Sequence, residues 1–407
     1  MSRQPLRVLV SGASVAGPTA AYWLARNGFE VTVVERMPLA RVRTGGHAVD
    51  LFGPAVDVAE WTGVLPAVMD ARTRTEIVSF QRHHGGGIDV EMRRLVAGIS
   101  GRHVEIMRGE LATILYEATR TDAQYLFDDS IQTIEQEPDG LAVTFESAPA
   151  DRFDVVVGAD GLHSAVRGLA FGPEDRFRRF LGGYLAGCAL PNHLGLEGRM
   201  VVWNAPGRLA AIYPVHGTGS ARGGFLFRLR EEVAIDHRDV AAQKRAVHQI
   251  YDQDGWQVPR LLAAMDAADD FYFDSISQIV MDDWVKDRVA LVGDAGYSPG
   301  PAVGGGTSIA MVGAYVLAQE LGRTGGDYPA GLRRYQERMR ELVTRSRGVG
   351  SSTMATLIPR TALQVRLLPE VLRLVTRMPS RVQQRLFQLQ ATPARALGSI
   401  QLTQDLP

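Results

Sequence analysis

Apolar and polar positions follow a strand–helix–strand pattern at the start of the chain. An apolar run at 6–10 leads into a glycine-containing segment at 12–17, and apolar residues then recur at helical spacing over 20–25. A second apolar run at 31–34 ends on Glu35. Short apolar runs are typical of buried parallel strands, and the spacing between them is typical of an amphipathic helix. The pattern predicts a βαβ unit with a tight turn after its first strand.

A buried strand followed by glycine and a helix is expected at two further places. One apolar run at 153–157 ends in Gly158, and another at 288–292 ends in Gly293. A strongly apolar helix is expected at 307–321, directly after consecutive glycines. Strands that alternate with helices favour a parallel sheet covered by helices, so we expect a Rossmann-like α/β fold.

The middle of the chain has a different pattern. Between 172 and 284, β-like runs are separated by Gly and Pro turns and accompanied by two helical stretches, 240–250 and 259–264. The β-like runs lie at 184–190, 200–203, 209–215 and 223–229. This arrangement is typical of an antiparallel sheet with a helix or two, and short strands of the same kind are expected within 73–103.

We therefore expect three parts. They are a discontinuous dinucleotide-binding domain of residues 1–72, 105–173 and 285–345, an inserted antiparallel-sheet domain of 73–104 and 174–284, and a C-terminal helical segment of 346–407. A helix is also expected at 55–69. The C-terminal segment is rich in arginine and has apolar residues at roughly helical spacing. We expect it to pack across the two domains, with a membrane-surface or dimer-forming helix as the alternative.

The first turn has the residues needed to bind a dinucleotide. Gly12 and Gly17 begin and end a G-x-G-x-x-G pattern, whose turn directs backbone N–H groups and the positive end of a helix dipole at a pyrophosphate. Ser14 replaces the middle glycine, and its hydroxyl can donate to a phosphate oxygen. Glu35 lies where a carboxylate accepts from the adenosine ribose hydroxyls. For this motif alone two alternatives stay open: a glycine-rich turn of another α/β protein, and a hydrolase nucleophile elbow at 12–16.

Composition narrows the classes of partner. The 407 residues are 45% apolar with a net charge of −1, so we expect no nucleic acid as partner. Cys188 is the single cysteine, which excludes an intrachain disulfide and suits a reducing compartment. No apolar run approaches the ~18 residues of a transmembrane segment, so a soluble, cytoplasmic protein is expected. His83 and His84 have no Cys or carboxylate cluster beside them, so we expect a loop there and no metal site.

Three motifs together resemble one enzyme family. They are Gly12–Gly17 with Glu35, the run Gly-Ala-Asp-Gly-x-x-Ser-x-x-Arg at 158–167, and Gly293-Asp294-Ala295 followed by Pro301-x-x-Gly304-x-Gly306. In order and spacing they resemble the single-component (class A) FAD-dependent monooxygenases of the p-hydroxybenzoate hydroxylase type. The stretch 304–308, with Tyr315 on the following helix, is similar to the branch that modifies aromatic polyketides and inactivates tetracycline-like antibiotics.

The resemblance implies an oxidoreductase that binds FAD and takes electrons from NADH or NADPH. It implies O₂-dependent hydroxylation of an aromatic or polycyclic small molecule, phenolic or polyketide-like, through a flavin C4a-hydroperoxide, so no catalytic side chain is expected. Other flavoproteins on the same scaffold stay as alternatives: a halogenase, a prenyl reductase, a monooxygenase fed by a separate reductase, or a non-enzymatic flavin-bound scaffold. The Trp-x-Trp-x-Ile-Pro segment expected of a halogenase does not occur. We expect a monomer or a homodimer.

The expected cofactor site joins the three motifs. Asp294 follows a strand and is placed to accept from the ribityl chain, while the helix that begins at Thr307 directs its positive end at the flavin N1 and O2. The full expected cofactor set is Gly12, Ser14, Ala16, Gly17, Glu35, Arg36, Arg43, Arg108, Asp160, Asp294, Gly304, Gly305, Gly306 and Thr307. Expected substrate contacts are His47, Asp50, Trp203, Tyr213, Phe225 and Phe227. Tyr297 and Ser308 depart from the family pattern and are expected near the flavin ring.

Overall fold

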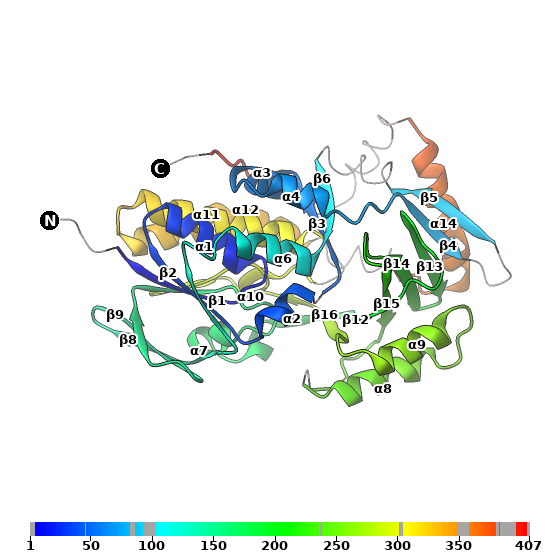
Figure 1. The fold of residues 1–407 in the computed structure, drawn as a ribbon, viewed down its shortest axis with the longest axis horizontal. Helices are drawn as coiled ribbons and strands as arrows, with labels where there is room; N and C mark the ends of the chain where they lie inside the picture. Colours follow the sequence, from blue (N-terminus) through cyan, green and yellow to red (C-terminus); the bar gives the residue numbers. More distant parts are fainter. Residues whose placement is uncertain are drawn as a thin grey trace.

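The computed structural model describes residues 5–44, 46–81, 86–92, 94, 102–233, 235–236, 238–300, 304–348, 358–379, 382 and 396–404. Two large β-sheets, each with its own helices, lie side by side (Figure 1). The expected loop with His83 and His84, and Pro301 of the third motif, lie outside the described residues.

The first sheet contains the predicted βαβ unit. Its six strands have the order β17–β18–β11–β1–β2–β7, and every neighbouring pair is parallel except β17 with β18. The strands are β17 (Val285–Lys286), β18 (Val289–Leu291), β11 (Val155–Gly158), β1 (Arg7–Ser11), β2 (Glu30–Glu35) and β7 (Gln124–Phe127). The expected Rossmann-like α/β fold is confirmed.

Helices stack on one face of this sheet, and a small sheet with α7 lies on the other (Figure 1). The helices are α1 (Ala16–Arg26), α3 (Gly53–Trp61), α4 (Leu65–Asp70), α6 (Arg108–Glu117), α11 (Gly306–Arg323) and α12 (Tyr328–Arg347). The other face carries β8 (Ile131–Glu137), β9 (Gly140–Phe145), β10 (Asp151–Phe153) and α7 (Ala165–Phe171). Trp23 and Tyr315 pack edge-to-face at 4.8 Å between α1 and α11, so the apolar faces of the two helices share one core.

The second sheet has seven strands in the order β16–β12–β15–β14–β13–β4–β5. They are β16 (Tyr272–Ile279), β12 (Arg178–Pro191), β15 (Ser220–Arg228), β14 (Arg208–Pro214), β13 (Arg199–Ala205), β4 (Ile77–Gln81) and β5 (Gly87–Glu91). Helices α8 (Val240–Tyr251) and α9 (Val258–Ala267) cover one face and enclose a second core that includes the buried Cys188. The sheet is not purely antiparallel, because β4 enters beside β13 in the same direction.

Three local expectations need correction. The helix expected at 55–69 is two helices, α3 and α4, because the chain turns at Gly63 with a left-handed φ of 80°. The run expected as one strand at 153–157 is divided between β10 and β11 at Asp154, whose carboxylate accepts from the Arg7 N–H at 2.7 Å. Strand β16 was not expected, because its buried residues include Ser275, Ser277 and Gln278.

A short two-stranded ribbon and three short helices lie in the connections between larger elements. Strands β3 (Ala48–Phe52) and β6 (His103–Met107) pair with each other, while α2 (Leu39–Thr44), α10 (Asp294–Tyr297) and the 3₁₀ helix η1 (Glu174–Arg176) lie in connections. The expected boundaries at 72/73 and 104/105 stay a prediction: β4 and β5 join the second sheet, and β6 pairs with a strand from before the first boundary.

The C-terminal segment touches both halves of the molecule. Helix α14 (Ala362–Arg377) packs on β5 and β13, and the Pro359 carbonyl accepts from the Gly207 N–H at 2.7 Å. Farther along, the Thr403 carbonyl accepts from the Tyr315 hydroxyl at 2.6 Å on the first half. In the described part of the chain, none of the helices combines the length and apolar character needed to cross a membrane.

Candidate active site

The three glycine turns meet at one edge of the first sheet. Strands β1, β11 and β18 are neighbours and parallel, so the turns that follow them emerge at the same edge. Ligands of open α/β sheets bind in the crevice beyond the carboxyl ends of such strands. The fold thus brings together residues that are far apart in the sequence.

The first turn leaves no room for side chains at its two end glycines. A Cβ on Gly12, which has φ of 105°, would lie 2.5 Å from the Ala159 carbonyl oxygen of the second turn. A Cβ on Gly17 would lie 1.8 Å from the Gly12 oxygen. Between them Ser14 is partly exposed and Ala16 is buried at the start of α1. Glycine is therefore required for the close packing of α1 on β1.

Glu35 holds the first turn from the end of β2. Its carboxylate accepts from the Ala13 N–H at 2.8 Å and from the Met37 N–H at 2.9 Å. Arg36, the next residue, is exposed. A carboxylate oxygen has more than one lone pair, so Glu35 can shape the turn and still accept from a ribose hydroxyl.

The second turn is fastened by Asp160 and Arg167. The Asp160 carboxylate accepts from the Ser164 hydroxyl at 2.5 Å and from the Val166 N–H at 3.1 Å. Burial raises the pKa of Asp160, and these hydrogen bonds oppose the rise. The fully buried Arg167 donates to the Ala295 carbonyl at 2.9 Å and so ties the second turn to the third. Arg167 was quoted in the motif but not expected as a site residue.

The third turn places Asp294 beside the start of α11. Gly304 and Gly305 have φ of 85° and 77°, and a Cβ on Gly306 would lie 3.7 Å from Asp294 Oδ1. Thr307 lies in the first turn of α11 and is partly buried. Burial raises the pKa of Asp294, while its hydrogen bond to Ser298 and the Arg108 guanidinium lower it.

The helices α1 and α11, which follow the first and third turns, have no side chain over their N-termini. Among the other helices, α7, α8, α12 and α14 are capped by Ser164, Asp239, Asp327 and Thr361, while α3, α4, α6, α9 and α10 also have no side-chain cap. Uncapped N-terminal N–H groups and the helix dipole favour a negative partner. The glycine turns and the open helix starts thus fit FAD.

Arg108 and His47 lie where this edge faces the second sheet. The Arg108 N–H donates to the His47 carbonyl at 3.1 Å, and a Cβ on Gly46 would lie 2.7 Å from Arg108 Nε. Burial and the cations of Arg108 and Arg222 lower the pKa of His47 to about 4. His47 Nδ1 is buried and has no hydrogen-bond partner among the described residues. A neutral imidazole with an unsatisfied nitrogen is suited to bind a ligand.

A cavity of about 150 Å³ lies between His47 and the second sheet. Its lining consists of Gly46, His47, Leu185, Ala186, Gly187, Leu209, Ala211, Tyr213, Arg222, Gly223, Gly224, Phe225, Leu226 and Tyr272. Arg222 and Tyr272 were not expected. Burial raises the pKa of both Tyr213 and Tyr272, so both phenols stay protonated near neutral pH. The cavity therefore offers hydroxyl, imidazole and guanidinium groups beside apolar strand residues.

Three of the expected substrate contacts belong to the helix-covered core. Phe225 and Phe227 direct their rings at Tyr251 of α8, with centroids 4.9 and 6.0 Å away. Trp203 is buried in the same core. Successive residues of a strand face opposite sides of a sheet, so the Phe225 and Phe227 rings point toward the helices, although Phe225 is also among the residues that line the cavity. We correct the assignment of Phe227 and Trp203 from substrate contacts to core residues, while the role of Phe225, which lines the cavity, stays a prediction.

Two further expected residues make contacts of another kind. The Asp50 carboxylate pairs with His103 Nε2 at 2.6 Å across the β3–β6 ribbon and does not line the cavity. Arg43 pairs with Glu117 at 2.5 Å and lies over the Tyr116 ring, which joins α2 to α6. These contacts give both residues structural roles.

The two departures from the family pattern have different surroundings. The Tyr297 hydroxyl bonds the Tyr335 hydroxyl at 2.8 Å, so its ring belongs to the core beside α12 and not to the flavin edge. The Ser308 hydroxyl donates to the Asp50 carbonyl at 2.9 Å and accepts from the Phe52 N–H at 3.0 Å. Ser308 thus ties the start of α11 to β3.

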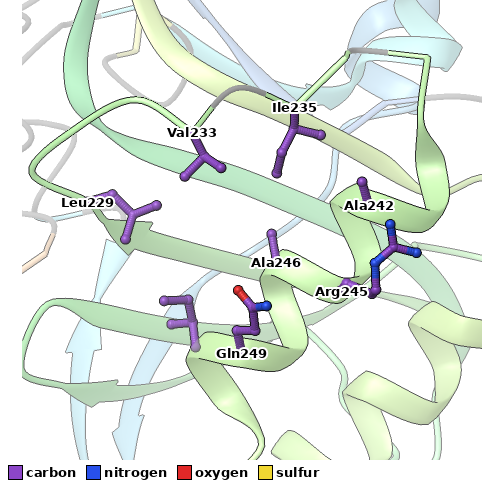
Figure 2. A pocket seen from close by; sticks show the side chains of 8 residues that line it. Leu229, Val233, Ile235, Ala242, Arg245, Ala246 and Gln249 are labelled. Carbon is purple, nitrogen blue, oxygen red and sulfur yellow. The ribbon is translucent and has the colours of Figure 1, made fainter.

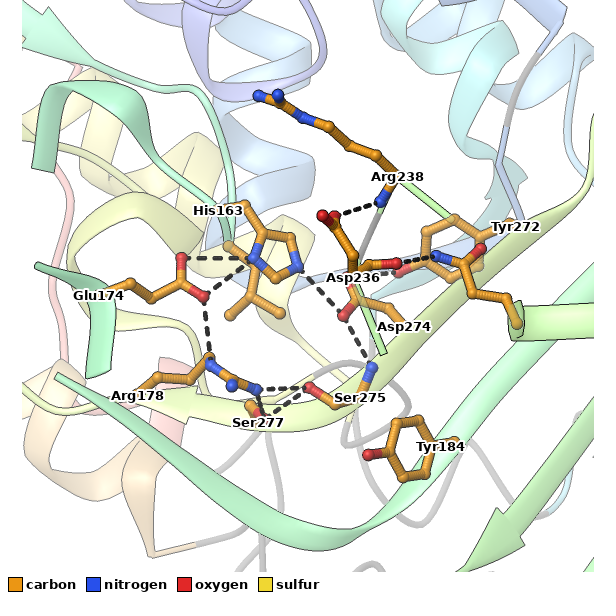
Figure 3. A network of polar contacts seen from close by, with 12 residues as sticks. His163, Glu174, Arg178, Tyr184, Asp236, Arg238, Tyr272, Asp274, Ser275 and Ser277 are labelled. Atoms are coloured by element: carbon orange, nitrogen blue, oxygen red, sulfur yellow. Dashed lines mark hydrogen bonds and ion pairs between the residues drawn. The ribbon is translucent and has the colours of Figure 1, made fainter. Parts of the chain in front are cut away.

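A polar network continues from the cavity toward the surface (Figure 3). The Tyr272 hydroxyl donates to Asp274 at 3.4 Å, and His163 of the second turn bonds Asp274 at 3.3 Å and Glu174 at 3.0 Å. Although burial lowers the pKa of His163, Asp274 and Glu174 raise it to about 9. The imidazolium therefore joins the second turn to β16.

A second cavity, of about 300 Å³, lies beside α8 (Figure 2). It is lined by Leu229, Val233, Ile235, Ala242, Arg245, Ala246, Gln249 and Ile250. None of these residues belongs to the three turns, so this cavity is not the site that the motifs build.

Several known proteins are similar to this chain in sequence or in fold. A family model described as an FAD binding domain matches residues 5–346. An uncharacterized protein of Mycobacterium tuberculosis is 43% identical over 349 residues, covering 85% of this chain and 93% of that protein. A flavin-dependent monooxygenase from an unknown prokaryotic organism is 39% identical over 344 residues, covering 84% of this chain and 88% of that protein. The crystal structure of tetracycline destructase Tet(55) is 33% identical, with a TM-score of 0.81 and coverage of 100% of both chains.

Proposed function

Because the chain belongs to the FAD-binding-domain family of flavin-dependent monooxygenases, we propose that it uses NADH or NADPH and O₂ to hydroxylate an aromatic or polycyclic small molecule. The observation that carries the proposal is the meeting of three glycine turns beside a small cavity with polar groups. The similarity to a protein named for tetracycline supports a polycyclic, oxygen-rich substrate.

Residues of the three turns have separate tasks in holding FAD. Glu35 would accept from the ribose, the uncapped start of α1 would bind the pyrophosphate, and Asp294 would accept from the ribityl chain. The uncapped start of α11 would offer N–H groups and a positive dipole end to the flavin ring. Bound FAD supplies hydride acceptance and oxygen transfer, so the protein has to orient the substrate and exclude water.

The residues around the cavity position the substrate. Neutral His47 and the protonated phenols of Tyr213 and Tyr272 bind its oxygens, and Arg222 favours the deprotonated form of a phenol or enol. An electron-rich phenolate is the form most open to electrophilic oxygen transfer. We expect the reaction to take place in the cytoplasm, with a monomer or homodimer as the working unit.

Steady-state turnover of the FAD-loaded protein tests the proposal. Oxidation of NADH and of NADPH and consumption of O₂ are measured with and without 1,8-dihydroxyanthraquinone, a flat phenolic probe. We expect one of the two nucleotides to be oxidised several-fold faster with the probe, and a product heavier by one oxygen atom.

Other outcomes identify the alternatives. Product formation only when a separate reductase supplies reduced flavin favours the reductase-fed monooxygenase, and chloride-dependent product favours a halogenase. A protein that retains FAD but oxidises no nucleotide and forms no product under any of these conditions contradicts the proposal.

A further inference from the structure

The face of the second sheet that borders the cavity is bare at its centre. Gly187 of β12 pairs with Gly224 of β15, and Gly224 pairs with Ala211 of β14. The three residues form one row across three neighbouring strands, and all of them line the cavity. Only the Ala211 methyl group stands above the backbone there.

The backbone at Gly224 does not itself require glycine. Its φ is not in the left-handed region, and the nearest atom to a built Cβ is the Ala186 carbonyl oxygen at 4.0 Å. Glycine weakens the interior of a strand and marks places where a ligand approaches the backbone closely. The space in front of Gly224 is therefore the cavity itself.

The rows on either side have opposite chemistry. On one side Leu185 pairs with Leu226, and Leu226 pairs with Leu209. These leucines pack with the buried Ile358 of the C-terminal segment, which closes that end. The row of leucines is an apolar wall for whatever lies on the bare row.

On the other side Arg222 pairs with Tyr213. Arg222 is 7% exposed and forms an ion pair with Asp270, which fixes its guanidinium beside the cavity. His47 lies across the cavity from this row, with its unsatisfied Nδ1. This row and His47 form a polar wall that suits an acidic hydroxyl.

Building on the proposed function, we propose that Gly187, Gly224 and Ala211 form a floor on which a flat, fused-ring substrate lies face down. Three strands span about 10 Å and neighbouring rows lie about 7 Å apart, which matches the plane of a few fused rings. The oxygen-bearing edge faces Arg222 and Tyr213, and the apolar edge faces the leucines. Gly224 is the residue that determines specificity for planarity.

The substrate, and not the flavin ring, is the occupant of this floor. No residue of the floor belongs to the three turns, and the open start of α11 lies on the other half of the molecule. A side chain added to the floor should therefore leave FAD binding intact.

Ligand titrations of the FAD-loaded enzyme test this inference. The probes are 1,8-dihydroxyanthraquinone, which is flat, and 4-cyclohexylphenol, whose second ring is puckered. We expect the wild-type enzyme to bind the flat probe more tightly. Gly224→Val should weaken the flat probe at least tenfold, and Gly224→Ala about threefold, with FAD affinity changed less than twofold.

Ala263→Val is the control, since Ala263 is exposed on α9, which covers the opposite face of the sheet, and lies outside the cavity lining. It should leave both probes unaffected. If Gly224→Val fails to fold, Gly224→Ala and Ala211→Val carry the test. Unchanged binding of the flat probe by these variants, a wild-type enzyme that does not prefer it, or a loss of FAD affinity in Gly224→Val would overturn the inference. Binding is measured without NAD(P)H. A failure of this inference can therefore be distinguished from a failure of the proposed turnover.

Discussion

Gly17 and Gly224, in the two halves of the molecule, serve opposite purposes. A Cβ on Gly17 in the first turn would collide with a backbone oxygen at 1.8 Å, whereas a Cβ on Gly224 in the second sheet would reach nothing closer than 4.0 Å. The cofactor half needs glycine so that its own backbone can close, and the substrate half leaves a space that a ligand can fill. Backbone geometry therefore defines the cofactor site, while the choice of side chains defines the substrate site.

Replacing a core ring on the covered face of the second sheet should have the largest effect. Phe227 stacks on Tyr184 with centroids 5.6 Å apart and is fully buried. Phe227→Ala should lower the free energy of unfolding by about 3–5 kcal/mol, because it leaves a cavity in a packed core. Urea denaturation measures the change. Gly224→Ala on the same strand but the opposite face is the control and should not lower stability; equal losses would contradict the division of the two faces.

Filling the first turn should have the next largest effect. Gly17→Ala should lower the free energy of unfolding by about 3 kcal/mol, the upper range for overpacking, and should abolish detectable FAD retention. Thermal unfolding and flavin absorbance after dialysis measure both effects. Gly168→Ala is the control, since nothing lies within 4 Å of a Cβ there in helix α7. A Gly17→Ala protein that still retains FAD would show that this turn does not hold the cofactor.

The contact that joins the two halves should respond to pH. The pKa of His163 is raised to about 9, above its ordinary value of 6.5, so the folded state favours the protonated form. The groups facing His163 are Glu174 and Asp274, with Arg167 and Arg178 behind Glu174 and Tyr272 behind Asp274.

Wild type should therefore exceed His163→Gln in stability by about 2 kcal/mol below pH 6.5, and this difference should fade as the pH rises to about 9. Chemical denaturation at a series of pH values measures it. His248→Gln is the control, because its partners Asp252 and Asp266 are exposed. A difference that grows with pH would refute the assignment of His163 as an imidazolium.

Removing the charge at the end of β2 should have the smallest effect. Glu35→Gln keeps the shape of the side chain but weakens its acceptance from Ala13, Met37 and the ribose, so FAD affinity should fall about tenfold, or about 1.4 kcal/mol. Fluorescence titration with FAD measures it. Glu30→Gln, on the same strand but exposed, should change affinity less than twofold. Equal effects at both positions would point to long-range charge and not to a contact.

The sequence predicts the first half of the molecule better than the second for a physical reason. At Gly12 and Gly293 the backbone adopts a left-handed φ. Such positions strongly favour glycine, so these turns can be recognised from the residue type alone. The strand–turn–helix order around them gave the α/β fold and the meeting of the turns.

The sequence of the second half gives weaker evidence about which residues face the cavity. Alternation along β15 predicts that Phe225 and Phe227 share a face but not which face meets the helices, so the pattern alone does not separate core rings from cavity residues. The sequence did not predict Arg222 and Tyr272 as cavity residues. A charged residue or an isolated aromatic ring in a strand is typical of an exposed position, and its buried partners are not visible in the sequence. Asp270 and Asp274, which hold them, come from elsewhere in the chain or from an unexpected strand.

The buried Cys188 makes the chain a convenient reporter of its own unfolding. The thiol is fully buried in the core beneath α8 and α9, and burial raises its pKa to about 11, so very little reactive thiolate is present in the native state. Alkylating reagents should modify it only when that core opens. A cysteine engineered onto the surface can then be labelled selectively in the folded protein. Alkylation of Cys188 itself measures how often that core opens.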